Sequence, residues 1–213
     1  MLTFVGDVHG WFAVFTKLRE RYQLTTPVIQ VGDLGFSHKI PKEWPKNLGF
    51  DTYAIAGNHE VHPWLDQFTE VTEVADRLFF VPRGTVMELE GKRIGFMGGA
   101  ESVDRAYRAP GIDWWPEERI TEEELQRLFN LPKPLDLLVT HSPPAEVVPL
   151  AVGVLNRKDW GLSPDWQDIS AQRIQQLWEH HGRIPIVSGH LHCSKQLSTC
   201  RILNIDECWE YSV

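Results

Sequence analysis

The chain has 213 residues, of which 42% are hydrophobic and 23% are charged, values typical of a folded globular protein rather than a disordered one. Lysine and arginine total 21 and aspartate and glutamate total 29, which gives a formal net charge of −8. This acidic balance argues against long nucleic acid or an anionic membrane surface as a partner, because both are bound mainly by excess Lys and Arg.

The sequence contains no recognisable targeting or membrane segment. The N-terminal residues MLTFVGDVHGWF have no basic region before a long apolar stretch, and no apolar run reaches the roughly eighteen residues of a spanning helix. Cys193, Cys200 and Cys208 are odd in number and close together, which favours reduced thiols over a disulfide framework. We therefore expect a cytoplasmic protein without membrane contact.

In the N-terminal half, short apolar runs surround one helical pattern. Three runs predict buried strands: Leu2–Val5, Pro27–Val31 and Thr52–Ala56. After the first run, Phe12–Tyr22 carries apolar residues at helical spacing. Three more strand-like runs follow, with Glu90 and Gly91 as a hairpin turn between the last two: Leu78–Val81, Thr85–Leu89 and Arg93–Met97.

In the C-terminal half, Thr121 begins a capping box that predicts a helix over Glu122–Phe129. A second helix, which Ser170 would cap and Gly182 would end, lies between two further apolar strands, Leu135–Thr140 and Ile184–Ser188. Three strand-like runs complete the chain: Gln196–Ser198, Arg201–Ile205 and Trp209–Val213. Mixed βα units and hairpins predict an α/β protein, with two packed mixed β-sheets flanked by helices in one domain over residues 1–213.

A short polar motif follows each of the five buried strands. In chain order the motifs are GDVHG from Gly6, GDLG from Gly32, GNHE from Gly57, THSPP from Thr140 and GHLH from Gly189. Ligands gather at the carboxyl ends of strands in layered α/β folds, so we expect eight side chains to converge there: Asp7, His9, Asp33, Asn58, His59, His141, His190 and His192. The glycines of the motifs permit sharp turns and let the backbone approach a bound ion closely.

This donor set indicates divalent metal ions. Carboxylate, imidazole and amide oxygen suit Mn, Fe or Zn, whereas a site for soft metals would contain cysteine. Eight groups exceed the needs of a single ion but suit two ions that share a bridging carboxylate. Two ions about 3.5–4 Å apart can clamp both the attacking and the leaving oxygen of an in-line displacement at phosphorus.

The five motifs resemble, in the same order, those of the calcineurin-like metallophosphoesterases, and they extend from residue 6 to residue 192. The resemblance implies the layered metallophosphoesterase fold and two divalent ions, with Mn expected first and Fe, Zn or another ion as alternatives. It assigns one ion to Asp7, His9, Asp33 and His192, and the other to Asp33, Asn58, His141 and His190. It further implies a metal-bridging hydroxide as nucleophile and His59 as the catalytic group that protonates the leaving oxygen.

One motif departs from a related pattern. Many phosphoprotein phosphatases of this superfamily read GDxxDRG, and Phe36 stands here where the second Asp would be. Either another carboxylate orients His59 or that histidine is a weaker acid. The missing Arg removes a phosphate clamp, which argues against a Ser/Thr protein phosphatase.

A segment after Met97 resembles an insertion in small bacterial and phage members of the superfamily. It contains Arg105 and Arg108, which are candidate substrate-binding residues, with a surface salt bridge as the alternative for each. The expected function is hydrolysis of a phosphomonoester or phosphodiester of open identity. The alternatives are a nuclease or nucleotide phosphodiesterase, including a lariat-debranching type, and a metal-binding scaffold without activity. The oligomeric state stays open.

Overall fold

The computed structural model describes residues 1–22, 26–36 and 43–212, which form two six-stranded mixed sheets. Sheet A contains β1 (Leu2–Val5), β2 (Val28–Gln30), β3 (Thr52–Ala54), β4 (Thr72–Ala75), β5 (Leu78–Phe80) and β12 (Cys208–Tyr211). Its order is β12-β1-β2-β3-β5-β4. The four inner strands are parallel, and β12 and β4 pair antiparallel at the two edges.

Sheet B has the same plan. It contains β6 (Thr85–Leu89), β7 (Lys92–Met97), β8 (Leu137–Thr140), β9 (Ile186–Ser188), β10 (Lys195–Leu197) and β11 (Cys200–Ile202). Its order is β10-β11-β9-β8-β7-β6, with four parallel inner strands and antiparallel edges. Because the inner strands of each sheet are parallel, their carboxyl ends lie together at one edge.

The two sheets pack face to face through an apolar layer. This layer includes Leu2, Phe4, Ile29, Val31, Ile94, Phe96, Leu137 and Val139. Successive residues of a strand point to opposite faces, so Leu137 and Val139 face the other sheet while Leu138 packs in the cluster beneath the helices. The inner strands β1, β2, β8 and β9 are therefore buried on both faces, as their continuous apolar runs predict.

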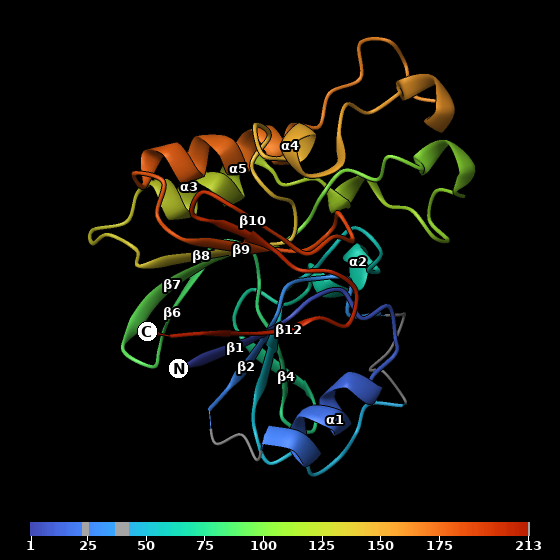
Figure 1. The fold of residues 1–213 in the computed structure, drawn as a ribbon. Coiled ribbons are helices and arrows are strands. Elements are labelled where there is room, and N and C mark those ends of the chain that lie inside the picture. The colour runs from blue at the N-terminus through green and yellow to red at the C-terminus, as the bar shows by residue number, and fades with distance from the viewer. Residues whose placement is uncertain (23–25, 37–42, 213) are drawn as a thin grey trace.

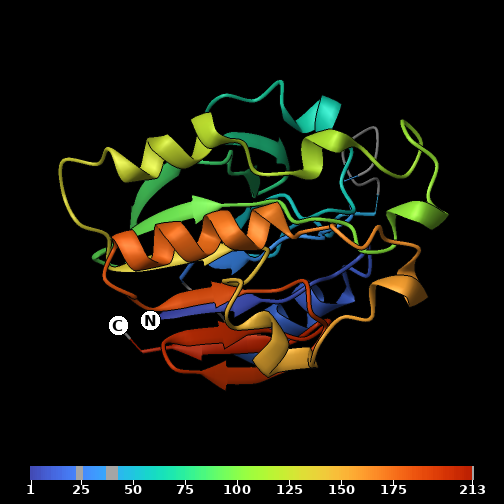
Figure 2. The ribbon, with the colours of Figure 1, turned by 90° about the horizontal axis from the view of Figure 1, so that it is seen from above.

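Helices cover the outer face of each sheet (Figure 1). The helices are α1 (Ala13–Tyr22) and α2 (His62–Leu65) beside sheet A, and α3 (Glu122–Phe129), α4 (Val148–Val152) and α5 (Ile169–His180) beside sheet B. Three 3₁₀ turns, η1 (Arg105–Tyr107), η2 (Pro116–Glu118) and η3 (Arg157–Trp160), lie in the connections. Figure 2 looks down on the helical layer over sheet B. The predicted fold class is confirmed, whereas the assignment of residues 1–213 to one domain stays a prediction.

Most local predictions are confirmed with small shifts of the bounds. The capping box of α3 is formed by Thr121 and Glu124, and positive φ angles at Glu90 (50°) and Gly91 (73°) make the predicted hairpin turn. Strand β4 is absent from the sequence prediction. It is an edge strand in which only Val74 is buried, so it carries no apolar run to reveal it.

The predicted cap of α5 is wrong. The N-cap is Asp168, whose carboxylate accepts a hydrogen bond of 2.8 Å from the Ala171 N–H, and the helix begins at Ile169. A carboxylate at this position also complements the helix dipole. The Ser170 hydroxyl instead accepts a bond of 3.2 Å from the Ile120 N–H, and so connects α5 to the segment before α3.

No helix in the described ranges is both long enough and apolar enough to cross a membrane.

The apolar layer between the sheets is expected to dominate stability. Replacing the fully buried Phe96 by alanine should lower the free energy of unfolding by about 3–5 kcal/mol, because it leaves a cavity between the sheets. The matched control Ile112→Ala removes a side chain that is 71% exposed and should cost no more than about 0.5 kcal/mol. Urea denaturation of the metal-free protein measures both values. Equal losses would show that Phe96 does not lie in the main core.

Candidate metal centre

The eight predicted site residues lie in loops that directly follow β1, β2, β3, β8 and β9. Sheet A supplies Asp7, His9, Asp33, Asn58 and His59, and sheet B supplies His141, His190 and His192. The site therefore lies where the carboxyl ends of the inner strands of both sheets meet. This is the place that strand polarity predicts.

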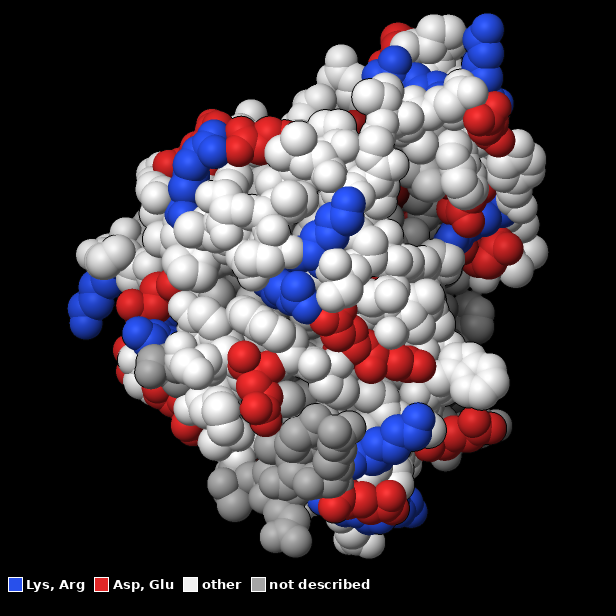
Figure 3. Space-filling model, viewed as in Figure 1, with Lys and Arg blue, Asp and Glu red and all other residues white. Residues whose placement is uncertain are grey.

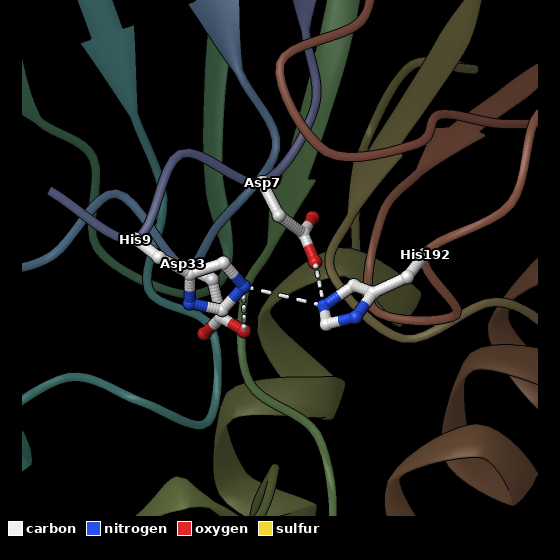
Figure 4. Close-up of side chains that lie close together, drawn as sticks. All are labelled: Asp7, His9, Asp33 and His192. Atoms are coloured by element: carbon white, nitrogen blue, oxygen red, sulfur yellow. Dashed lines mark hydrogen bonds and ion pairs between the residues drawn. The ribbon is translucent and has the colours of Figure 1, made fainter. Parts of the chain in front are cut away.

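The first predicted ligand group is assembled in the structure. Suitable ligand atoms of Asp7, His9, Asp33 and His192 all lie within 4.8 Å of one another, and Figure 4 shows the four side chains pointing together. The His192 Nε2 atom is 3.1 Å from Asp7 Oδ2 and 3.2 Å from His9 Nε2. Two carboxylates and two imidazoles at this spacing are able to hold one divalent ion.

The second predicted group is contiguous with the first. His141 Nε2 lies 3.4 Å from Asp33 Oδ2 and 3.2 Å from Asn58 Oδ1. His190 Nδ1 lies 3.1 Å from the same Asn58 oxygen. Asp33 therefore has contacts with members of both groups, as a bridging carboxylate requires.

The surroundings of one carboxylate oxygen, Asp33 Oδ2, indicate whether a cation fits the site. Asp33 Oδ2 is buried and has no hydrogen-bond partner in the described part of the chain, while Asp33 Oδ1 accepts a bond of 2.9 Å from the His59 N–H. A buried carboxylate oxygen without a partner is costly. Oδ2 lies 3.9 Å from His9 Nε2 and 3.4 Å from His141 Nε2, between the two groups. Its position and lack of a donor fit a pair of cations.

The charges of the site also suit metal binding. Burial by itself would raise the pKa of the Asp33 carboxyl, but the His141 imidazole and other nearby histidines hold that pKa well below its usual range. Burial, together with the charge of His141, lowers the pKa of His190 to about 3. The centre thus presents an ionised carboxylate and a neutral His190, which is the form of histidine that binds metals. Against the effect of burial, Asp33 and Asp7 raise the pKa of His141 to about 10, so His141 would release a proton on binding a metal.

Four candidate ligands adopt left-handed backbone conformations. The φ angles are 48° at His9, 54° at Asp33, 68° at His190 and 48° at His192. Such conformations are uncommon outside glycine and cluster at functional sites, where the surrounding structure imposes them. Here the backbone amides of His9 and His190 are tied to Asp33 O (2.7 Å) and to the Asp7 carboxylate (3.1 and 3.2 Å).

The motif glycines make room for ligand side chains. A Cβ atom on Gly57 would lie 2.0 Å from Asp33 Oδ1, and one on Gly189 would lie 2.1 Å from Asp7 Oδ1. A Cβ atom on Gly32 would lie 2.4 Å from His141 Nδ1. These three glycines therefore act by clearing the space that Asp7, Asp33 and His141 occupy. The sequence predicts that these glycines let the backbone approach a bound ion, and in the structure they let it approach the candidate ligand side chains.

A buried carboxylate that the sequence analysis did not assign connects two of the motif loops. Glu60 is fully buried and accepts bonds from the Gly35 N–H (3.1 Å) and the Gly57 N–H (2.5 Å). Burial and the nearby Asp33 raise the pKa of Glu60 to about 8. Its place within the GNHE motif is a signal, but only the structure shows that it fixes the two loops relative to each other.

A second unassigned group orients a candidate ligand. The Asn58 Nδ2 group donates a bond of 3.0 Å to Ser102 Oγ, and Ser102 Oγ donates one of 2.6 Å to Glu118 Oε2. Glu118 Oε1 accepts further bonds from the Ser102 N–H (2.7 Å) and the Trp114 indole (3.0 Å). This chain fixes the Asn58 amide so that its oxygen faces His141.

The side chain of Arg108 contacts that of His59. Its Nη2 atom is 2.7 Å from His59 Nε2 and 2.8 Å from Asp104 Oδ2. Arginine has only N–H donors, so Arg108 donates to an unprotonated His59 nitrogen. Burial, and to a lesser extent Arg108, lower the pKa of His59. Phe36, which stands where the related motif has an Asp, is buried among aromatic side chains and does not orient His59. On the exposed side, the carboxylate of Asp104 is linked to His59 through Arg108.

The two candidate arginines differ. Arg108 lies at the site, whereas the Arg105 guanidinium has no hydrogen bond or ion pair with any described residue. Arg105 begins the 3₁₀ turn η1 and is partly exposed. The structure therefore brings only one of the two to His59.

Comparisons with known proteins agree with this geometry. A sequence model described as calcineurin-like phosphoesterase matches residues 1–194. The chain is 27% identical over 190 residues to a protein of Synechococcus sp. (strain ATCC 27144 / PCC 6301 / SAUG 1402/1) named "probable cyclic nucleotide phosphodiesterase". The match covers 84% of this chain and 62% of that protein, so the chain spans less than two thirds of this relative's length.

The bond from Asn58 to Ser102 yields a test of the centre. Ser102→Ala removes the group that orients the amide, and we expect Mn²⁺ affinity to fall about 10- to 100-fold, as for other residues that orient metal ligands. Isothermal titration calorimetry measures the affinity, and circular dichroism checks the fold. The control Ser163→Ala, at an exposed serine, should bind Mn²⁺ as the unmodified protein does. Unchanged affinity in Ser102→Ala would exclude the orienting role.

Proposed function

The chain belongs to the calcineurin-like phosphoesterase family, and on that premise we propose that it is a binuclear metal-dependent phosphoesterase. The observation that carries the proposal is the Asp33 carboxylate, whose buried Oδ2 atom has no described donor and lies between two ligand groups. Each group supplies an ionised carboxylate together with nitrogen or amide oxygen ligands. We propose Asp7, His9, Asp33 and His192 for one ion, and Asp33, Asn58, His141 and His190 for the other.

Mn²⁺ is the ion that we propose first, and Fe and Zn suit the same donors. Two such ions would lower the pKa of a water molecule and neutralise charge on the phosphate oxygens. The chain as a whole carries a net charge of −8, so a locally positive centre would be needed to attract an anionic ester.

We assign His59 and Arg108 to the substrate rather than to the metals. The two side chains meet at 2.7 Å, beside the ligand groups, and His59 keeps 38% of its side chain exposed. Arg108 is held by Asp104, which leaves further N–H donors for a phosphate oxygen. To protonate the leaving oxygen, as general acids of this type do, His59 Nε2 would first have to bind a proton, and Arg108 would then turn from His59 to the phosphate.

A second, narrower candidate is hydrolysis of a nucleotide phosphodiester. The observation that favours it is the name of the relative from Synechococcus, a probable cyclic nucleotide phosphodiesterase. A cytoplasmic location also stays a proposal.

Metal removal tests the main proposal. We expect hydrolysis of p-nitrophenyl phosphate or bis(p-nitrophenyl) phosphate to stop in chelator and to return when Mn²⁺ is added. A parallel assay of 3′,5′-cyclic AMP tests the narrower candidate. Full activity after metal stripping would exclude the metal mechanism. Tight Mn²⁺ binding without hydrolysis of any of these esters would favour a non-catalytic scaffold.

Substitution of the bridging carboxylate gives a sharper result. Asp33→Asn should lower kcat at least about 100-fold, because it removes a charge that both ions need. Circular dichroism of the metal-free protein checks that the fold is kept, because the substitution also removes the carboxylate that lies 3.4 Å from the His141 imidazole. The matched control Asp51→Asn, on the surface, should keep full activity. Wild-type kcat in Asp33→Asn would contradict the bridging assignment.

The two arginines form a natural pair of variants. Arg108→Ala should lower kcat/KM about 10- to 100-fold, as expected for loss of a hydrogen bond from a charged group. Arg105→Ala serves as the control and should stay within about twofold of the wild-type value, because its guanidinium has no bond to any described residue. Steady-state kinetics with bis(p-nitrophenyl) phosphate measure kcat/KM of both variants and of the wild type. Equal effects of the two substitutions would contradict the assignment of Arg108.

A further inference from the structure

A cavity of about 750 Å³ lies next to the metal centre. One end is formed by the candidate ligand His190 and its neighbour Leu191, and the walls come from α4, η3 and the first turn of α5. Its volume is within the usual range for small-molecule sites and far exceeds the space that a phosphate group needs. The cavity therefore has room for the organic part of an ester whose phosphorus lies at the metals.

Most of the wall is apolar or aromatic, and three charged residues also line it: Arg157, Asp159 and Asp168. Val152 and Val154 are 54% and 92% exposed, and Trp160 is 39% exposed, so apolar surface in the described structure faces this space without a cover. Trp166 is 92% buried, but its indole N–H has no hydrogen-bond partner among the described residues. A buried donor of this kind requires an acceptor.

Two amide side chains add hydrogen-bonding capacity. Gln172 Nε2 donates a bond of 3.2 Å to Gln167 Oε1, and both residues line the cavity. Both side chains are exposed, and the Gln172 oxygen, an acceptor, and the Gln167 NH₂, a donor, stay available to a ligand because neither has a partner among the described residues. One donor and one acceptor side by side match the edge of a nucleobase.

The segments around the cavity hold each other in place. The Tyr107 hydroxyl donates a bond of 3.2 Å to Asp159 O, and this bond joins η1 to η3. The two segments also lie side by side in both ribbon views (Figures 1 and 2). Because η1 directly precedes Arg108, the cavity and the His59–Arg108 pair are connected through the chain.

We propose that this cavity binds the nucleoside part of a nucleotide phosphoester. The assignment rests on the proposed function, since it places the phosphorus of the same substrate at the metal centre. Aromatic walls favour a planar ring, and the free amide groups with the Trp166 N–H favour a base over an alkyl chain. The substrate class is a small nucleotide, because the net charge is −8 and acidic and basic residues are interspersed on the face in Figure 3.

Two diesters with the same leaving group test the proposal: thymidine 5′-(p-nitrophenyl phosphate) and methyl p-nitrophenyl phosphate. Wild-type protein loaded with Mn²⁺ should give a kcat/KM at least about 10-fold higher for the thymidine ester. Gln172→Trp fills the cavity from an exposed position on α5. It should lower the ratio of the two kcat/KM values at least about 10-fold. Trp160→Ala should reduce the same ratio. The matched control Leu150→Trp, on α4 but outside the cavity, should keep it.

A binding measurement separates this inference from the proposed function. Adenosine and thymidine carry no phosphate, and we expect either to quench tryptophan fluorescence of the chelator-treated protein, with the effect lost in Gln172→Trp. If neither these diesters nor p-nitrophenyl phosphate is hydrolysed, the proposed function fails, whereas nucleoside binding by the chelator-treated protein still tests the cavity independently. If both diesters are hydrolysed with the same ratio in wild type and Gln172→Trp, the cavity assignment is overturned. Equal kcat/KM values of the wild-type protein for the thymidine and methyl diesters would also overturn it.

Discussion

The organisation of the site depends on the cost of a buried, ionised carboxylate. Asp33 is 1% exposed, its pKa is held low by neighbouring histidines, and one of its oxygens has no described donor. Such a charge is tolerated in a protein interior only when opposite charge lies close to it. His141 supplies part of that charge without metal, and a cation pair would supply it in full. The loops after five strands place their polar side chains around this carboxylate.

The centre also connects the two sheets. Asp7 and Asp33 belong to loops of sheet A, while His141 and His192 belong to loops of sheet B. Ions held by both sets would cross-link the sheets at one edge, in addition to the apolar layer that joins their faces. Metal binding and folding are then coupled, because the unfolded chain offers no comparable site. Without metal, the apolar layer that contains Phe96 and the bonds between the loops, such as those from the His190 N–H to the Asp7 carboxylate, hold the sheets together.

The local sequence was sufficient to predict which polar side chains follow the strands, but not which residues contact them. Motifs such as GDVHG follow apolar runs, and parallel strands bring their carboxyl ends together, so the convergence of Asp7 and His190 is predictable. By contrast, the Asn58–Ser102–Glu118 chain joins segments 44 and 16 residues apart, and no periodicity encodes such contacts. The same holds for Arg108, which sequence paired with Arg105. The α5 cap was missed because Asp168 and Ser170 are both good caps and tertiary packing decided between them.

The cleared space beside the ligands has a consequence for mutational robustness. A lost imidazole at His9 or His192 leaves a gap that water can fill, because both side chains are partly exposed. An added methyl at Gly57 or Gly189 has no such remedy, since it would overlap a buried carboxylate oxygen. These two glycines contribute no donor atom, yet the space around the Asp33 and Asp7 carboxylates fixes them. A side chain at either position would displace a candidate ligand without removing one.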